Sequence, residues 1–124
     1  MVNKQDFINA INKDIDMVRG DTLAFDFQLA GLGSSAAYEA LEVTLAVAEH
    51  YDDVAIIECI NGDGVELEEY DTTSDTATFS VCIAPTKTKT MDLARYYYDL
   101  QIKDDANVIT LMRGRFTLLY DVAD

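Results

Sequence analysis

Residues 88–103 read TKTMDLARYYYDLQIK, and residues 108–122 read VITLMRGRFTLLYDV. Both runs are rich in β-branched and aromatic residues, which favour extended strands. The short acidic segment 104–107 (DDAN) lies between them, with the length and composition of a hairpin connection. The sequence therefore predicts a long β-hairpin near the end of the chain.

Three earlier segments alternate apolar and polar residues, which is the pattern of a strand with one buried face. They cover residues 22–29, 41–47 and 76–83, and the last of them places Cys82 on the outward face. The side chains expected to point inward are Leu23, Phe25, Phe27, Leu29, Leu41, Val43, Leu45, Val47, Ala77, Phe79, Val81 and Ile83.

The remaining segments predict shorter elements. Strands are expected at 15–18 and 65–69, and the apolar run 54–60 predicts a strand covered on both faces, ending at a hairpin turn over 61–64 (NGDG). The Gly- and Ser-rich residues 30–38 and the polar residues 71–75 predict loops, and Pro85 ends the strand before it. Phe7, Ile8 and Ile11 share one face of a possible short helix over 4–12.

About seven to eight short strands separated by turns predict an all-β fold, an antiparallel β-sandwich. We expect an N-terminal arm or short helix over residues 1–18 and a single sandwich domain over residues 19–124.

Composition narrows the function. With 124 residues, 49% of them hydrophobic, the chain can build one core, and its formal net charge of −14 disfavours binding to nucleic acid or to an anionic membrane surface. Neutral or basic partners are expected instead. The N-terminal residues carry no signal-peptide pattern, which predicts no Sec export. The sparse Cys59 and Cys82 predict two free, mostly buried thiols.

Residues 92–98 (DLARYYY) resemble the segment that leads into strand F of immunoglobulin domains. The resemblance implies an immunoglobulin-like sandwich in which Tyr96 forms a tyrosine corner, with its ring buried and its hydroxyl bonded to a nearby backbone group. Asp92 and Asp99 flank this structural corner and begin the hairpin. Tyr98 occupies the place of the usual cysteine, and the chain has no tryptophan, so antibody-type recognition is not implied.

A second resemblance extends further along the chain. The patterns RGDTxxFxFxL at 19–29, TxxLxxYxYDLQI at 90–102 and VxTLxxGxFxLxxDV at 108–122 look like those of small structural proteins of tailed phages and prophages. This group includes baseplate, fibre-attachment and head-decoration components. The resemblance implies a virion protein that is assembled in the bacterial host cytoplasm, without catalysis, and whose partners are other virion proteins or further copies of itself.

The last strand carries apolar residues on both faces, which suggests a contact surface. Ile109 and Leu111 are expected on one face, and Val108 and Met112 on the other. Burial of both faces fits either a subunit interface or a central strand beneath the N-terminal helix. The predicted interface residues are Tyr97, Ile109, Leu111 and Leu119, with Arg113 and Arg115 able to pair with carboxylates or to remain solvated.

Other candidate sites are weaker. The tripeptide 19–21 (RGD) is better explained as a turn in which Gly20 supplies backbone freedom, and the acidic turns at 52–53, 63 and 104–105 could share a calcium ion only if they met at one end of the sandwich. His50 is the only histidine, so neither a catalytic set nor a metal or cofactor site is predicted. Two rival functions stay open, namely a carbohydrate- or cell-surface-binding module and a metal-dependent enzyme.

Overall fold

The computed structural model describes residues 11–51, 53–92, 94–105 and 107–120, which form nine strands and two short helices. The helices are α1 (Ser35–Glu39) and α2 (Pro85–Thr88). The strands are β1 (Ile11–Asn12), β2 (Ile15–Val18), β3 (Leu23–Ala30), β4 (Glu42–Ala48), β5 (Ile57–Asn61), β6 (Gly64–Asp71), β7 (Thr76–Ile83), β8 (Arg95–Lys103) and β9 (Val108–Leu119).

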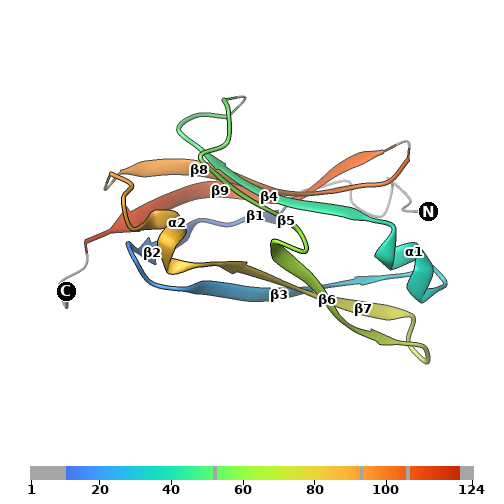
Figure 1. Ribbon diagram of the computed structural model, residues 1–124. Helices are drawn as coiled ribbons and strands as arrows, with labels where there is room; N and C mark the ends of the chain where they lie inside the picture. The colour runs from blue at the N-terminus through green and yellow to red at the C-terminus, as the bar shows by residue number, and fades with distance from the viewer. Residues whose placement is uncertain (1–10, 52, 93, 106, 121–124) are drawn as a thin grey trace.

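The strands form one mixed sheet in the order β1-β9-β8-β4-β5-β6-β7-β3, with β2 also paired to β9. Figure 1 shows that this sheet folds over between β5 and β6, so that β9, β8 and β4 lie above β3, β6 and β7. We call β1, β2, β9, β8, β4 and β5 layer one, and β6, β7 and β3 layer two. The all-β prediction is confirmed.

The prediction of a purely antiparallel sheet is wrong in two places. Both β1 and β2 run parallel to β9, and β5 pairs with β6 in parallel over two positions. The predicted tight turn is present, because the backbones of Ile60 and Asp63 exchange hydrogen bonds of 3.0 and 2.9 Å, and it carries the chain from one layer to the other. Its glycines do adopt positive φ, at +82° for Gly62 and +99° for Gly64.

The alternating segments form the core as predicted. The even spacing of apolar residues in β4 and β7 places one complete face of each strand between the layers. β3 shows the same alternation, and its inward side chains are only partly covered until Leu29, which is buried. Cys82 lies outward and exposed whereas Cys59 is buried, so the prediction of two mostly buried thiols is wrong for Cys82.

The predicted C-terminal hairpin is present, and it contains a β-bulge. Leu100 pairs with Met112, but the next residue, Gln101, pairs with Thr110, so that Leu111 has no partner in β8. The extra residue reverses which positions point inward. Ile109 is buried before the bulge, whereas Phe116 and Leu118 are buried after it. This reversal explains the apolar residues that the sequence appears to place on both faces.

Segment 11–18 belongs to layer one. The chain leaves the parallel ladder at Lys13, whose carbonyl oxygen accepts a hydrogen bond from the Tyr98 hydroxyl. A Cβ atom at Gly114 would overlap this same carbonyl, so the backbones approach closely at that position, which is a common reason for a glycine within a strand. The helix predicted over 4–12 lies outside the described residues, apart from Ile11 and Asn12, which are strand.

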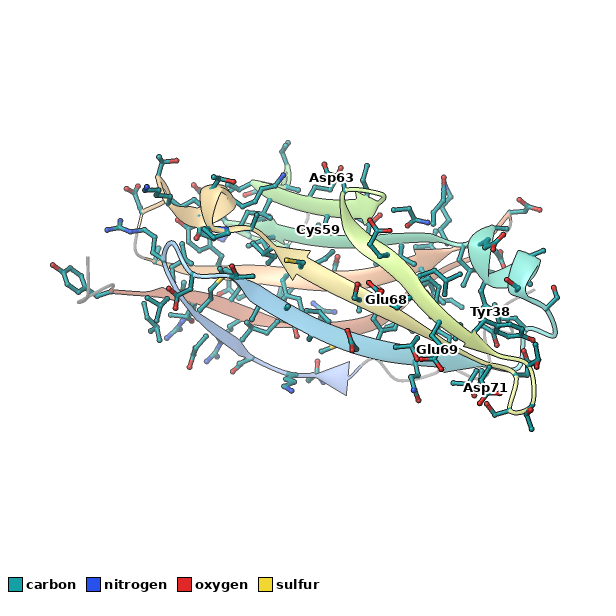
Figure 2. The ribbon with its side chains drawn as sticks, turned by 60° about the horizontal axis from the view of Figure 1, so that its bottom comes forward. Tyr38, Cys59, Asp63, Glu68, Glu69 and Asp71 are labelled. Carbon is teal, nitrogen blue, oxygen red and sulfur yellow. The ribbon has the colours of Figure 1, made fainter. Side chains whose placement is uncertain are left out.

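The predicted loop over 30–38 contains α1. Ser34 is its N-cap and accepts a hydrogen bond from the Ala37 amide. The helix buries Tyr38 at one end of the folded sheet, next to the β6–β7 turn (Figure 2). The Tyr38 hydroxyl donates to the Asp75 carbonyl oxygen at 2.9 Å, and the Tyr70 hydroxyl donates to the Asp75 carboxylate at 3.1 Å. Asp75 therefore fastens α1 to layer two.

The segment 54–60 also differs from its prediction. The strand begins only at Ile57, and Val54 and Ile56 precede it in the connection from β4. Val54 is 90% exposed, and Ile56 and Ile60 are exposed as well. Apolar character alone does not distinguish a strand covered on both faces from one whose outer face is open.

Candidate functional site

The outer faces of the two layers differ in character. Layer two presents acidic side chains, including the Glu68, Glu69 and Asp71 labelled in Figure 2. Among the described residues, every exposed large apolar side chain lies in layer one, in its β4–β5 connection or directly after β9. These side chains are Tyr51, Val54, Ile56, Ile60, Val108, Leu119 and Tyr120.

A hollow of about 240 Å³ lies on the outer face of layer one. Outward side chains of β4, β8 and β9 line its base, and the β4–β5 connection, which projects from the sheet in Figure 1, bounds it. Three alanines, Ala46, Ala48 and Ala55, create the space because they are short. We call this site the tyrosine hollow; the residues that give it chemical character are Tyr51, Asp53, Tyr97, Asp99, Gln101 and Arg113.

Aromatic and cationic groups stack at one side of the tyrosine hollow. The rings of Tyr51 and Tyr97 lie 4.8 Å apart at 45°, and the Arg113 guanidinium lies 4.3 Å above the Tyr51 ring. The Tyr51 hydroxyl also donates to the Gly114 carbonyl oxygen at 3.1 Å. These contacts hold the β4–β5 connection against β8 and β9, which defines the shape of the hollow.

Asp99 supplies a carboxylate at the base of the tyrosine hollow. It is half-buried and accepts a long hydrogen bond, 3.4 Å, from the Gln101 amide nitrogen. Burial raises the pKa of Asp99, and the positive charge of Arg113 on the neighbouring strand opposes that rise. Among the described residues, no lysine or arginine side chain forms a salt bridge with Asp99. The carboxylate thus retains capacity for a ligand with hydrogen-bond donors or positive charge.

A broader groove of about 620 Å³ continues along the same face and shares Gln101 with the tyrosine hollow. Ile60 and Val108 contribute its exposed apolar walls. The ion pair between Lys103 and Glu42, 3.9 Å long and well exposed, also lies along it. The hollow and the groove together form one recessed strip across β5, β4, β8 and β9.

The structure places the predicted corner residues in two different sites. Tyr96 is 6% exposed, and its hydroxyl donates to the Asp92 carbonyl oxygen at 2.9 Å, which is the hydrogen bond expected of a tyrosine corner. Burial raises the pKa of Tyr96. Asp99 takes no part in this contact because it points outward into the tyrosine hollow.

The predicted interface residues also separate into groups. Ile109 is 4% exposed and Leu111 packs against the core, so neither offers an open contact surface. Tyr97 and Arg113 line the tyrosine hollow. Leu119 and Arg115 are exposed. The interface prediction is wrong for Ile109 because the bulge at Leu111 turns Ile109 inward.

The other candidate motifs are part of the fold. Gly20 adopts a φ of +87°, as its predicted turn requires, and its amide donates to the buried Thr88 hydroxyl. Arg19 donates to the Met91 carbonyl oxygen. The turns that hold Asp53 and Asp104 lie at opposite ends of β4 and β8, which prevents a shared calcium ion. In the parts of the chain that the structure describes, no three His, Cys, Asp or Glu residues could hold a metal ion together.

Sequence reasoning missed the contribution of the β4–β5 connection. Tyr51 and Asp53 come from an expected surface turn, and Gln101 is an outward strand residue without a distinctive motif. A signal was present in β4, where the outward positions after Glu42 and Thr44 hold the small residues Ala46 and Ala48. Small outward residues on a central strand leave room for a ligand or for another chain segment.

Comparison with known proteins shows a likeness of fold. Neither a protein-family model nor a curated protein matches the sequence. A solved structure of a family 123 glycoside hydrolase from Clostridium perfringens, described in terms of glycolipid glycan hydrolysis, matches 94% of this chain with a TM-score of 0.55 and 13% identity. The match covers 24% of that enzyme, so this chain corresponds to about a quarter of its length. Among the described residues, no helix is long and apolar enough to cross a membrane.

Proposed function

We propose that this chain is a non-enzymatic structural protein of a tailed-phage or prophage particle, either a tail or baseplate adaptor or a capsid decoration protein. It would act through stoichiometric contacts with other virion proteins or with further copies of itself, after assembly in the cytoplasm of the bacterial host. The observation that carries the proposal is the asymmetry of the two outer faces. Exposed apolar side chains gather on layer one, whereas layer two presents acidic side chains.

This asymmetry supports assembly because apolar side chains that are buried against a partner are removed from water, which favours association. Exposed apolar side chains beside a recessed strip, such as Ile60 and Val108 on the walls of the groove, are a usual feature of protein contact sites. The acidic face of layer two would stay in water and would keep the free protein soluble before assembly.

We further propose that the fold is an immunoglobulin-like sandwich. Two observations support it: the folded-over arrangement of the layers and the hydrogen bond from Tyr96 to the Asp92 carbonyl oxygen. The parallel strands β1 and β2 would be an addition to that architecture along the β9 edge.

Mass spectrometry of sedimented, nuclease-treated particles from a culture that makes the protein tests this function. Recovery at a fixed ratio to the major coat protein is the expected result, and the ratio would separate a decoration protein in hundreds of copies from a ring-forming adaptor. Absence from the particles, with the chain abundant in the lysate, would refute the proposal.

A carbohydrate- or cell-surface-binding module is the second candidate, favoured by the tyrosine hollow. Exposed aromatic rings beside carboxylate and amide groups are suited to the faces and hydroxyls of sugars. Binding on a glycan array that disappears when Tyr97 is replaced by alanine would favour this candidate. Silence across the array would remove it.

A further inference from the structure

We infer that the tyrosine hollow is a receptor for one cationic side chain, an arginine or a lysine, presented by a partner protein. The inference rests on the proposed function for the identity of that partner, a neighbouring subunit in the assembly. The site itself is defined by the contacts of Tyr97, Asp99 and Gln101 and can be tested without any particle.

Charge is the first argument. The tyrosine hollow contains two carboxylates, Asp99 at its base and Asp53 in the β4–β5 connection, in a chain with a net charge of −14. The resident cation, Arg113, has its guanidinium over the Tyr51 ring and does not pair closely with either carboxylate. A positively charged side chain that enters the hollow from a partner is therefore attracted by a negative potential.

Asp99 gives the second argument, because a partly buried carboxylate without strong hydrogen bonds carries a free-energy cost that a cationic ligand would reduce. Its one hydrogen bond within the described residues, from Gln101, is 3.4 Å long, and burial raises its pKa. A guanidinium or ammonium group would supply short, charge-assisted hydrogen bonds to the carboxylate oxygens and would favour its ionised form.

The aromatic groups add a second kind of attraction. The Tyr97 ring lies 4.8 Å from the Tyr51 ring and 6.5 Å from the His50 ring, and Tyr97 lines the hollow and is partly exposed. Cations are stabilised over such rings, and arginine does so most often because its guanidinium is planar and weakly hydrated. The chain already uses this contact internally, where Arg113 stacks over Tyr51.

Size selects a single side chain. Pockets for drug-sized ligands begin at about 300 Å³, whereas the tyrosine hollow has about 240 Å³. The adjoining groove, with Ile60 and Val108 on its walls, offers apolar surface for the rest of the partner segment. A buried arginine anchor next to apolar contacts is a common arrangement at protein interfaces.

Solution NMR with N-acetyl-arginine amide as the probe tests the inference. Titration into the isotopically labelled 124-residue chain should give saturable chemical-shift changes at Tyr97, Asp99 and Gln101. N-acetyl-citrulline amide has nearly the same shape without the charge, and it should bind at least about tenfold more weakly because it cannot form a charged pair with Asp99.

Two variants of equal charge make the test specific. Asp99→Asn should weaken binding of the arginine probe about tenfold, whereas Asp26→Asn, on the exposed face of β3, should leave it unchanged. Equal affinity for the citrulline probe, or an equal effect of both variants, would overturn the inference. Saturable binding of methyl glycosides at these residues in place of the arginine probe would also overturn it.

Failure of this experiment is distinguishable from failure of the proposed function. The titration reports the chemistry of the hollow in the isolated protein, and particle composition reports whether the protein is a virion component. A protein that binds the arginine probe but is absent from particles keeps the site and changes the class of the partner.

Discussion

Layer one and layer two use the same alternation of buried and exposed residues, yet their outer faces have different properties. In β3 and β6 the outward positions include Asp26, Glu66 and Glu69, whereas in β4 they include Ala46 and Ala48. Layer one also contains the parallel strands β1 and β2 and the tyrosine hollow. A β-bulge does not distinguish the layers, because β9 has one at Leu111 and β6 has a register shift between Leu67 and Glu69. The inward alternation thus specifies the fold, and the outer face of layer one departs from the acidic exterior of layer two at the recessed strip on which both proposals rest.

The substitution with the largest expected effect on stability tests whether the close contact between β9 and segment 11–18 stabilises layer one. Gly114→Ala places a methyl group onto the Lys13 carbonyl oxygen, so β1 and β2 must move. We expect a loss of about 3 kcal/mol in the free energy of unfolding, measured by urea denaturation.

Gly62→Ala is the control for this substitution. Its Cβ meets no atom within 4 Å, and its cost should be about 1 kcal/mol because φ is positive. If the two alanine substitutions cost the same, the contact between Gly114 and Lys13 does not hold layer one together.

The next prediction concerns pH and the same contact. Burial raises the pKa of Tyr98 from 10.0 to about 12, so the folded state retains the phenolic proton more strongly than the unfolded state does. The stabilisation is complete below pH 10 and is lost as pH rises from 10 towards 12, by roughly 2 kcal/mol in all. Urea denaturation across this pH range should show the loss.

Tyr98→Phe removes the group that titrates and should flatten this part of the profile. Some slope should remain, because the pKa values of Tyr38 and Tyr96 are also raised by burial. An unchanged slope in the variant would assign the alkaline loss to these other tyrosines.

A smaller effect is expected where layer two holds α1. Asp75→Asn keeps a residue that tolerates the positive φ of 50° but removes the charge that accepts hydrogen bonds from Tyr38, Tyr70 and the Gly33 amide. We expect a loss of about 1 kcal/mol in unfolding free energy. Asp26→Asn, which makes the same change of charge on an exposed strand position, should have almost no effect on thermal stability.

The last prediction concerns an aspartate placed on the surface of each layer. It should change stability least, and it should distinguish the two layers by their role in particle assembly. Leu119→Asp in layer one and Ala24→Asp in layer two both place a carboxylate at an exposed strand position, so each should change stability by less than about 0.5 kcal/mol. Incorporation into particles should fall for Leu119→Asp and persist for Ala24→Asp. Unfolding of the Leu119 variant would instead assign that side chain to the core.

Much of the fold follows from local sequence pattern. β2 and β7 were predicted with the bounds that the structure shows, and the C-terminal hairpin follows from two β-rich runs and a short turn. The pattern showed the bulge at Leu111 only indirectly, as apolar residues on both faces of the last strand, and that pattern fits a subunit interface or a central strand equally well. It could not reveal the parallel pairing of β1 and β2, since register between distant segments is decided by tertiary contacts.

The candidate site was only partly predictable for the same reason. Tyr97, Asp99 and Arg113 were identified from the sequence, but as interface or corner residues. Their meeting with Tyr51 depends on the path of the β4–β5 connection across β8 and β9. That path brings together residues widely separated in the chain, and a period-two pattern carries no information about it.

The parallel strands at the beginning of the described chain have a consequence for biosynthesis. Ile15 pairs with Phe116 and Val18 with Leu119, so β2 acquires its partner only after the ribosome has made every other strand. Until then segment 11–18 is an unpaired nascent chain, and pairing between such distant segments is slow to form. Stop codons placed just before β9 should therefore produce chains that depend on chaperones and are cleared by proteases.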